Sequence, residues 1–189
     1  MTISVISVLK NSTKGATKKM QAQTIHIKQE EKKIWDILGR VCDPEVPVLT
    51  ILDLGIVRAV TLSETGVEIS ITPTYSGCPA MDMIATNIRI ELMAAGYETI
   101  SIKNKLSPAW TTDWMTQSGK DKLKAYGIAP PSEKPQVCHQ DLFAPNEAIP
   151  CPHCNSYHTH RISEFGSTAC KSLYQCLDCK EPFDYFKCH

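Results

Sequence analysis

Four cysteines near the carboxyl end of the chain form two Cys-x-x-Cys pairs. Cys151 and Cys154 make the first pair, Cys176 and Cys179 make the second, and 21 residues separate the two pairs. Each pair can supply two thiolates, so together they can surround one ion tetrahedrally, as in a zinc ribbon. Two disulfides or four independent thiols are the alternatives. Paired motifs at this interval rarely arise by chance, so the spacing favours a metal site.

The segment that carries these cysteines, residues 150–189, is too short to fold on a hydrophobic core alone. A metal would supply the missing stability, since structural zinc contributes on the order of 10–16 kcal/mol to small modules. Four cysteines also hold [2Fe–2S] clusters, but a redox-inert zinc ion better suits a fixed docking module. His153 lies inside the first pair, where side chains usually point outward, and is not counted as a ligand.

A second candidate for chemistry is Cys78, in the segment PTYSGCPA of residues 73–80. A helix is predicted to begin at Pro79 or Ala80, because proline suits the first helical position. Unpaired N–H groups and the helix dipole at such a position lower the pKa of a thiol. Cys78 is therefore predicted to be a reactive or metal-binding thiol. The alternative is a buried cysteine that packs as a small apolar side chain.

Three carboxylates, Asp43, Glu45 and Asp53, lie in the loop before the first predicted strand. If this loop folds over the start of the helix, they become neighbours of Cys78. They would then either bind a metal or raise the pKa of the thiol. Otherwise they cap turns within the loop.

The remaining cysteines carry weaker predictions. Cys42 is predicted to pack in the core at the end of an amphipathic helix, and Cys138 is not assigned a role. Cys170, Cys188 and His189 are potential additional ligands near the ribbon. Their alternative is that Cys170 packs in the ribbon core and the Cys-His end is solvated.

Composition excludes several classes of protein. The 189 residues include 20 basic and 20 acidic side chains, so net charge gives no case for binding nucleic acid or an anionic membrane. No run approaches 18 apolar residues, and therefore no membrane span is expected. Nine cysteines, an odd number, occur without a secretory signal. Together with the zinc motif, they predict a protein of the reducing cytoplasm.

Apolar periodicity and turn residues predict the elements that position these groups. Helical spacing of Ile34, Ile37, Leu38 and Val41 predicts the first helix. We expect strands over 56–62, 67–71 and 99–106, and helices from 79 or 80 to about 95 and from 112 to 126. The predicted fold is a small α+β domain of three layers or fewer, with a short mixed or antiparallel sheet, two to three helices and a following zinc ribbon. The predicted boundaries are a disordered tail 1–24, the α+β domain 25–128, a linker 129–149 and the ribbon 150–189.

Several segments together carry a resemblance. They are DPEVP (43–47), LDLGIV (52–57), PTYSGCPA (73–80), SEFGSTACK (163–171) and EPFDYFKC (181–188). The first three resemble the signatures of small α+β proteins that assemble and target iron–sulfur clusters. All five resemble the D-subunit family of bacterial phenylacetyl-CoA epoxidases (ring 1,2-epoxidases), in which such a domain is fused to a zinc ribbon. The resemblance covers residues 28–189.

The resemblance implies an accessory role in aerobic phenylacetate breakdown. The epoxidases of this family have a catalytic subunit with a di-iron centre and a reductase subunit with flavin and a [2Fe–2S] cluster; these are the implied partners. The D-type protein of this family is thought to help insert or maintain one of the iron centres. Cys78 matches the cysteine that handles iron or a cluster transiently, and Asp53 matches a position that shapes the same site. The ribbon cysteines match ligands of structural zinc.

The chain lacks the residues of a di-iron enzyme, since it contains no Glu-x-x-His pair. Dinucleotide, NTP and serine-hydrolase fingerprints are also missing, so the chain is not expected to be catalytic itself. One thiolate holds a cluster poorly, so a homodimer or a client would complete the site. The alternatives are a structural subunit that couples the oxygenase and the reductase, a thiol enzyme in which Cys78 is the nucleophile, and a nucleic-acid-binding ribbon. The nucleic-acid-binding alternative is disfavoured because few aromatic residues of the ribbon lie together with basic residues.

Overall fold

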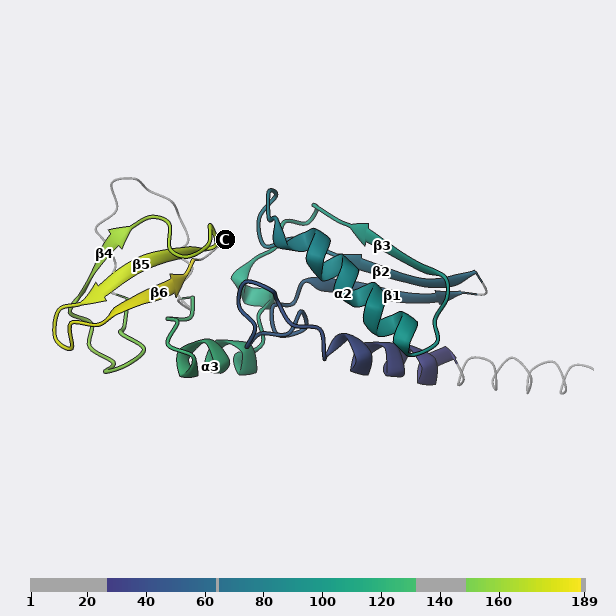
Figure 1. Cartoon of the computed structure of the whole chain (residues 1–189), viewed down its shortest axis with the longest axis horizontal. Helices are drawn as coiled ribbons and strands as arrows, with labels where there is room; N and C mark the ends of the chain where they lie inside the picture. Colours follow the sequence, from purple (N-terminus) through teal and green to yellow (C-terminus); the bar gives the residue numbers. More distant parts are fainter. Residues whose placement is uncertain (1–26, 64, 132–148, 188–189) are drawn as a thin grey trace, which may run out of the picture.

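The computed structural model describes residues 27–63, 65–131 and 149–187. Two three-stranded sheets lie one after the other along the long axis of the molecule, one in an α+β domain and one in a ribbon (Figure 1). This arrangement confirms the predicted fold class. The predicted tail, most of the predicted linker, Cys138, Cys188 and His189 lie outside the described residues.

The first sheet is mixed. Strands β1 (Val57–Ser63) and β2 (Gly66–Ile71) form an antiparallel hairpin, and β3 (Ile100–Asn104) pairs with β2 in parallel. A parallel pair needs a crossover, which is supplied by helix α2 (Ala80–Ala94). The predicted third strand over 99–106 is longer than β3, because its partner β2 ends at Ile71, opposite Asn104.

The first helix covers residues 27–38 of the described chain. The predicted helix over 112–126 is instead two elements, a 3₁₀ turn (Thr112–Trp114) and α3 (Gln117–Ala125). Thr116 between them has an extended backbone, and its side chain accepts the Gly119 N–H at 2.9 Å. A threonine in this geometry is an N-cap, which begins a new helix rather than continuing the old one.

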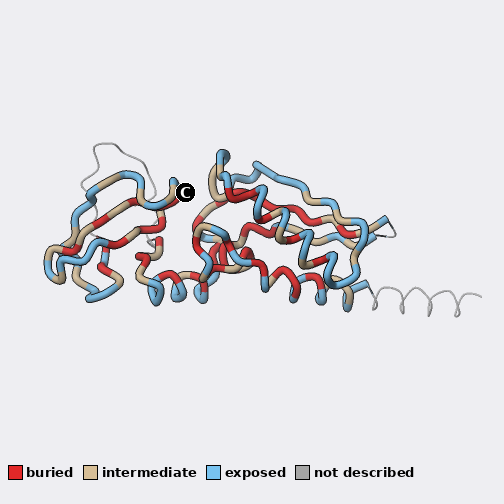
Figure 2. Tube along the Cα trace, viewed as in Figure 1, coloured by how far each residue is buried: buried red, intermediate tan, exposed pale blue. Residues whose placement is uncertain are grey.

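The core of the α+β domain lies between the sheet and the two longer helices (Figure 2). On α2 the buried apolar residues recur every three or four positions, as expected of a helix with one covered face. On β2 they alternate, as expected of a half-buried strand. The fully buried side chains of these elements are Ile34, Leu38, Ile69, Ile71, Ile84, Ile88 and Leu92.

The ribbon is an antiparallel sheet of β4 (Thr159–Ser163), β5 (Lys171–Cys176) and β6 (Pro182–Phe186), in that order. Its own core is small and contains three aromatic rings. The rings of Tyr174 and Phe183 stack with centroids 5.8 Å apart, and Tyr185 meets Tyr174 edge-on at the same separation.

A backbone pairing and a ring contact help to join the ribbon to the α+β domain. Ala129, which follows α3, pairs with β6: its N–H donates to the Asp184 carbonyl at 2.8 Å, and its carbonyl accepts the Phe186 N–H at 2.9 Å. The Phe186 ring packs edge-on against Trp110, with centroids 6.4 Å apart. Phe186 and the ribbon residue Cys170 therefore belong to the core of the α+β domain as well as to the ribbon.

Candidate functional site

The four ribbon cysteines come together at one end of their sheet. Their sulfur atoms all lie within 4.8 Å of one another, with 3.7 Å between Cys151 and Cys179 and 3.6 Å between Cys154 and Cys176. Four sulfurs about 2.3 Å from a central zinc stand roughly 3.8 Å apart along each tetrahedron edge. The donor set and its spacing therefore fit zinc. All four are free thiols rather than disulfides.

The backbone around the cysteines is shaped to present sulfur to a metal. The residue after each pair, Asn155 and Lys180, has a positive φ (60° and 66°), which turns the chain back over its sulfurs. At the second pair, the N–H groups of Cys179 and Asp178 point at the Cys176 sulfur. These hydrogen bonds lower the pKa of Cys176 to about 6. Cys176 is thus the cysteine that most readily supplies a metal-binding thiolate, whereas burial and the neighbouring sulfurs raise the pKa of Cys154 and raise that of Cys179 to about 12.

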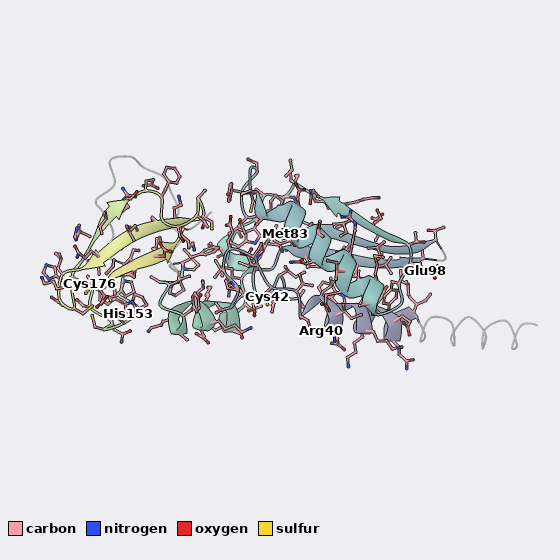
Figure 3. The ribbon with its side chains drawn as sticks, viewed as in Figure 1. Arg40, Cys42, Met83, Glu98, His153 and Cys176 are labelled. Carbon is pink, nitrogen blue, oxygen red and sulfur yellow. The ribbon has the colours of Figure 1, made fainter. Side chains whose placement is uncertain are left out.

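Polar side chains tie the two cysteine pairs together. Asp178, in the second pair, accepts hydrogen bonds from Ser156 and from His158 Nδ1, the latter at 3.0 Å. The bond from Ser156, then that from His158, lowers the pKa of Asp178. His153 is absent from the ligand set, as predicted, and lies with Cys176 in the ribbon half of the molecule (Figure 3).

Cys78 lies just before α2, as predicted, but its pKa is raised rather than lowered. Half-burial is the largest cause, and the negative charges of Glu45 and then Asp43 add to it. Hydrogen bonds from the Ala80 N–H and from Tyr75 oppose the rise without cancelling it. The loop therefore covers the helix start, and its carboxylates raise the pKa of the thiol, which is one of the two outcomes that the sequence left open for this position.

That loop brings two of the three predicted carboxylates to Cys78. Asp43 is buried, and its Oδ1 accepts the N–H groups of Glu45 and Val46, each at 2.8 Å. This turn directs the Glu45 carboxylate towards Cys170, whose sulfur lies 3.7 Å from Glu45 Oε2. Both alternatives from the sequence therefore hold: Asp43 caps a turn, and the turn places carboxylates beside the thiol.

Cys170 is a thiol of this site that sequence reasoning did not connect to Cys78. It is buried, and burial is the main reason that its pKa is raised to about 11, with Glu45 adding to the effect. The hydroxyl of Thr168 lies 3.0 Å from its sulfur. The pKa of Tyr75 is raised to about 12. Burial is the largest cause, followed by the charges of Cys78, Glu45 and Cys170. We call Cys78, Cys170, Glu45, Asp43 and Tyr75 the thiol site.

Asp53 makes its contacts away from the two thiols. Its carboxylate accepts the Thr50 N–H (3.0 Å) and hydroxyl (2.9 Å), the Thr116 hydroxyl (3.2 Å) and the Lys122 ammonium (2.6 Å). Thr50 in turn pairs with Cys42, next to Asp43. Asp53 thus anchors to α3 the loop that carries Asp43. Its predicted influence on the Cys78 site remains a prediction, for which this anchoring offers a route.

Cys42 is exposed, so the prediction that it packs in the core was wrong. Its thiol makes one weak hydrogen bond, 3.8 Å, to the carbonyl of Arg40, and both residues lie where the first helix leads into the loop (Figure 3). The helix has already ended at residue 38, before the buried Val41, and Cys42 pairs in extended geometry with Thr50.

The thiol site leads to a prediction about pH. The Glu45→Gln substitution removes a negative charge that raises the pKa of Cys78, so that pKa should fall and more thiolate should be present at pH 8. Cys78 should then be alkylated severalfold faster, with the midpoint of its pH–rate profile moved to lower pH. Peptide-resolved mass spectrometry after iodoacetamide treatment measures this.

The exposed Glu98, at the other end of the α+β domain, provides the matched control (Figure 3). Glu98→Gln removes an identical charge and should leave the alkylation rate of Cys78 unchanged. Equal rates in both variants and the unsubstituted chain would show that Glu45 does not act on Cys78.

Both domains match known families. Residues 31–98 match a family model described as iron-sulfur cluster assembly protein, and residues 135–187 match one described as PaaD zinc beta ribbon domain. The thiol site draws Cys78 from the first matched segment and Cys170 from the second.

Known proteins extend these matches. The chain is 52% identical over 156 residues to a protein from Escherichia coli K12 described as the candidate D component of 1,2-phenylacetyl-CoA epoxidase, covering 82% of this chain and 92% of that protein. An Fe-S protein maturation auxiliary factor from Porphyromonas gingivalis W83 is 33% identical over 97 residues, covering 50% and 91% respectively. A crystal structure of a DUF59 domain from Bacillus anthracis superposes with a TM-score of 0.50 at 27% identity, covering 53% and 96%.

Within residues 27–63, 65–131 and 149–187, helices of the length and apolar character needed to cross a membrane are not found.

Proposed function

The chain belongs to the D-subunit family of the 1,2-phenylacetyl-CoA epoxidase, and from that premise we propose that it is a maturation factor. In this proposal it helps to insert or maintain the iron or iron–sulfur centre of another epoxidase subunit. Cys78 is the thiol that handles the metal. The chain does not itself turn over phenylacetyl-CoA.

One observation carries the proposal: Cys78, half-buried and under the charges of Glu45 and Asp43, lies in the segment that matches an iron-sulfur cluster assembly protein. Thiolates and carboxylates are the common protein ligands of iron. The similarity of this segment to a maturation auxiliary factor supports the same role. Asp53 supports it indirectly, by holding the loop that places Asp43 and Glu45.

The ribbon has a separate part in this function. Its four cysteines hold a structural zinc ion, which fixes the small sheet as a rigid module. We assign to it the docking of the chain to the catalytic di-iron subunit or the reductase subunit. The seven cysteines among the described residues are all free thiols, which suits the reducing cytoplasm as the place of action.

The test is the iron content of the epoxidase from cells whose only copy of this chain carries Cys78→Ser. The di-iron and [2Fe–2S] centres are quantified separately after anaerobic isolation. We expect one of them to be strongly depleted while the subunits remain in normal amounts, and the depleted centre identifies the client. Cys42→Ser is the matched control, because Cys42 is an exposed thiol outside the thiol site. Full centres in the Cys78→Ser cells would reject the maturation role.

A structural subunit that couples the oxygenase and the reductase is the second candidate. Three large apolar side chains of α2 are exposed along one face of the helix: Met83 (53%), Ile90 (56%) and Met93 (62%). Such a stripe is typical of a surface that binds another protein. If coupling is the function, Ile90→Lys should dissociate the complex, and Cys78→Ser should leave both assembly and iron content intact.

A further inference from the structure

We infer that Ser156 and Asp178 control how slowly the ribbon loses its zinc ion, because hydrogen bonds between their side chains join the two cysteine pairs beside the most exposed ligand. We call Ser156, His158 and Asp178 the polar clamp. This role rests on the part of the proposed function that assigns zinc to the ribbon, and it is independent of the maturation role of Cys78.

Two side-chain contacts cross from one cysteine pair to the other. The Ser156 hydroxyl, just after the first pair, donates to Asp178 Oδ2, and His158 Nδ1 lies 3.0 Å from Asp178 Oδ1. Asp178 lies inside the second pair. The contacts span 22 and 20 positions of the chain, so neither belongs to a local turn. Both oxygens of one carboxylate therefore hold the segment that follows the other pair.

The backbone connects each end of the polar clamp to metal ligands. The Ser156 carbonyl accepts the Cys151 N–H at 2.9 Å, and the Ser156 N–H is hydrogen-bonded to the Cys154 sulfur. On the other side, the Asp178 N–H is hydrogen-bonded to the Cys176 sulfur. A shift at either end of the clamp would thus move a sulfur that binds the ion.

The polar clamp is also held together internally. The Ser156 hydroxyl accepts the His158 N–H at 2.9 Å, and the His158 carbonyl accepts the Leu177 N–H at 2.7 Å. Leu177 directly precedes Asp178. Backbone bonds therefore close the same path that the side chains close. Groups fixed by several partners in this way orient the metal ligands beside them.

The polar clamp lies at the ligand that solvent reaches most easily. Cys151 and Cys176 are buried and Cys179 is half-buried, whereas Cys154 is exposed. A chelator or a competing thiol that displaces the ligands one at a time would meet the exposed sulfur first. Ser156 holds this sulfur through its N–H and is itself bound by Asp178. Loss of the clamp should therefore let Cys154 leave the ion more often.

Two simpler explanations compete with this role. In the first, Asp178 only adds negative charge near a cation. Glu181→Ala tests it, because Glu181 is exposed just after the second pair, and its loss removes the same charge without removing a bond of the clamp. In the second, the side chains are too exposed for their bonds to matter, as is common for surface ion pairs: His158 is 65% exposed and Asp178 is 55% exposed.

The experiment measures the rate at which the full chain, loaded with equimolar zinc, loses the ion to excess EDTA at neutral pH. Absorption of the chain loaded with Co²⁺ instead shows beforehand whether the four-sulfur site is intact. Ser156→Ala and Asp178→Ala should each lose zinc about tenfold faster or more, as is typical of partners that orient metal ligands. Ser156→Thr keeps the hydroxyl, so it should lose zinc at the unsubstituted rate, and Glu181→Ala should do the same.

The double substitution Ser156→Ala/Asp178→Ala gives the most direct evidence. If the two residues act through the bond between them, removal of the second adds little once the first is gone. The double variant should then lose zinc about as fast as the faster single variant. If they act independently, the two accelerations should multiply.

The outcomes are distinct. Unchanged rates in both single variants overturn the inference, and so does a double variant whose acceleration is the product of the two. Equally fast loss from Glu181→Ala overturns it in favour of charge alone. If Ser156→Ala takes up no metal, normal uptake by Ser156→Thr still assigns the defect to the hydroxyl, whereas failure of both overturns the inference. These results do not depend on the iron content of the epoxidase in Cys78→Ser cells, so the clamp and the maturation function are tested separately.

Discussion

Removal of zinc is expected to unfold residues 149–187 while the α+β sheet stays folded. The ribbon has few buried apolar residues of its own, and structural zinc contributes on the order of 10–16 kcal/mol to modules of this kind. Cys176→Ser, which removes one of four sulfurs, should have a similar effect because three ligands leave the site open. The α+β domain should persist because its buried helices and sheet form most of the larger core.

Hydrogen exchange resolved by peptide measures this separation. After treatment with a zinc chelator, or in Cys176→Ser, amides of β5 and β6 should exchange fully while those of β2 and α2 keep their protection. Cys42→Ser treated without chelator provides the control, since its thiol lies outside the ribbon. Protection of β5 that survives complete removal of zinc would show that the ribbon folds on its aromatic core.

Phe186→Ala is expected to destabilise the chain by about 3–5 kcal/mol, the usual cost of removing a fully buried phenylalanine. Phe186 is the last residue of β6 and packs against Trp110 of the α+β domain, so its loss opens a cavity where the domains meet. The Trp110 indole N–H bonds the Leu54 carbonyl at 2.8 Å, which holds the other wall of that cavity in place. A wall that cannot collapse makes the cavity costly.

Denaturation in urea measures the free energy of unfolding, and Phe165→Ala provides the control. Phe165 is in the same module but is 63% exposed, so its removal should change stability by no more than about 0.5 kcal/mol. Phe186→Ala should retain zinc, because Phe186 is no ligand, and should speed alkylation of Cys78 and Cys170 as the interface opens. A loss below about 1 kcal/mol for Phe186→Ala would mean that the domains do not depend on this contact.

The zinc ribbon could be predicted from sequence because its information is local. The spacing of the two Cys-x-x-Cys pairs predicts which four cysteines bind one ion, and the structure brings those four sulfur atoms together. Cys78 could likewise be placed at a helix start from Pro79 and Gly77. The fold class followed from the same kind of local pattern, since apolar period and turn residues mark each element.

The composition of the thiol site could not be predicted in the same way. No spacing rule connects Glu45 to Cys170 across 125 residues, because their contact depends on how two domains pack. The direction of the Cys78 pKa stayed open for the same reason: the helix start that lowers it is a local feature, whereas the burial and the neighbouring carboxylates that raise it depend on tertiary packing. The break before α3 could not be predicted because Thr116 fits a helical segment by sequence, and its capping hydrogen bond alone shows it to be a boundary.

The pairing of Ala129 with β6 means that the segment matched by the ribbon family and the segment that packs as the ribbon differ in this chain. The zinc ribbon family begins its match at residue 135, yet Ala129 is fully buried in the ribbon core. A ribbon transplanted from residue 135 onward would leave the Phe186 N–H and the Asp184 carbonyl without their partners from Ala129. The ribbon of this chain therefore depends on its neighbour, because its last strand is completed by Ala129, which follows α3.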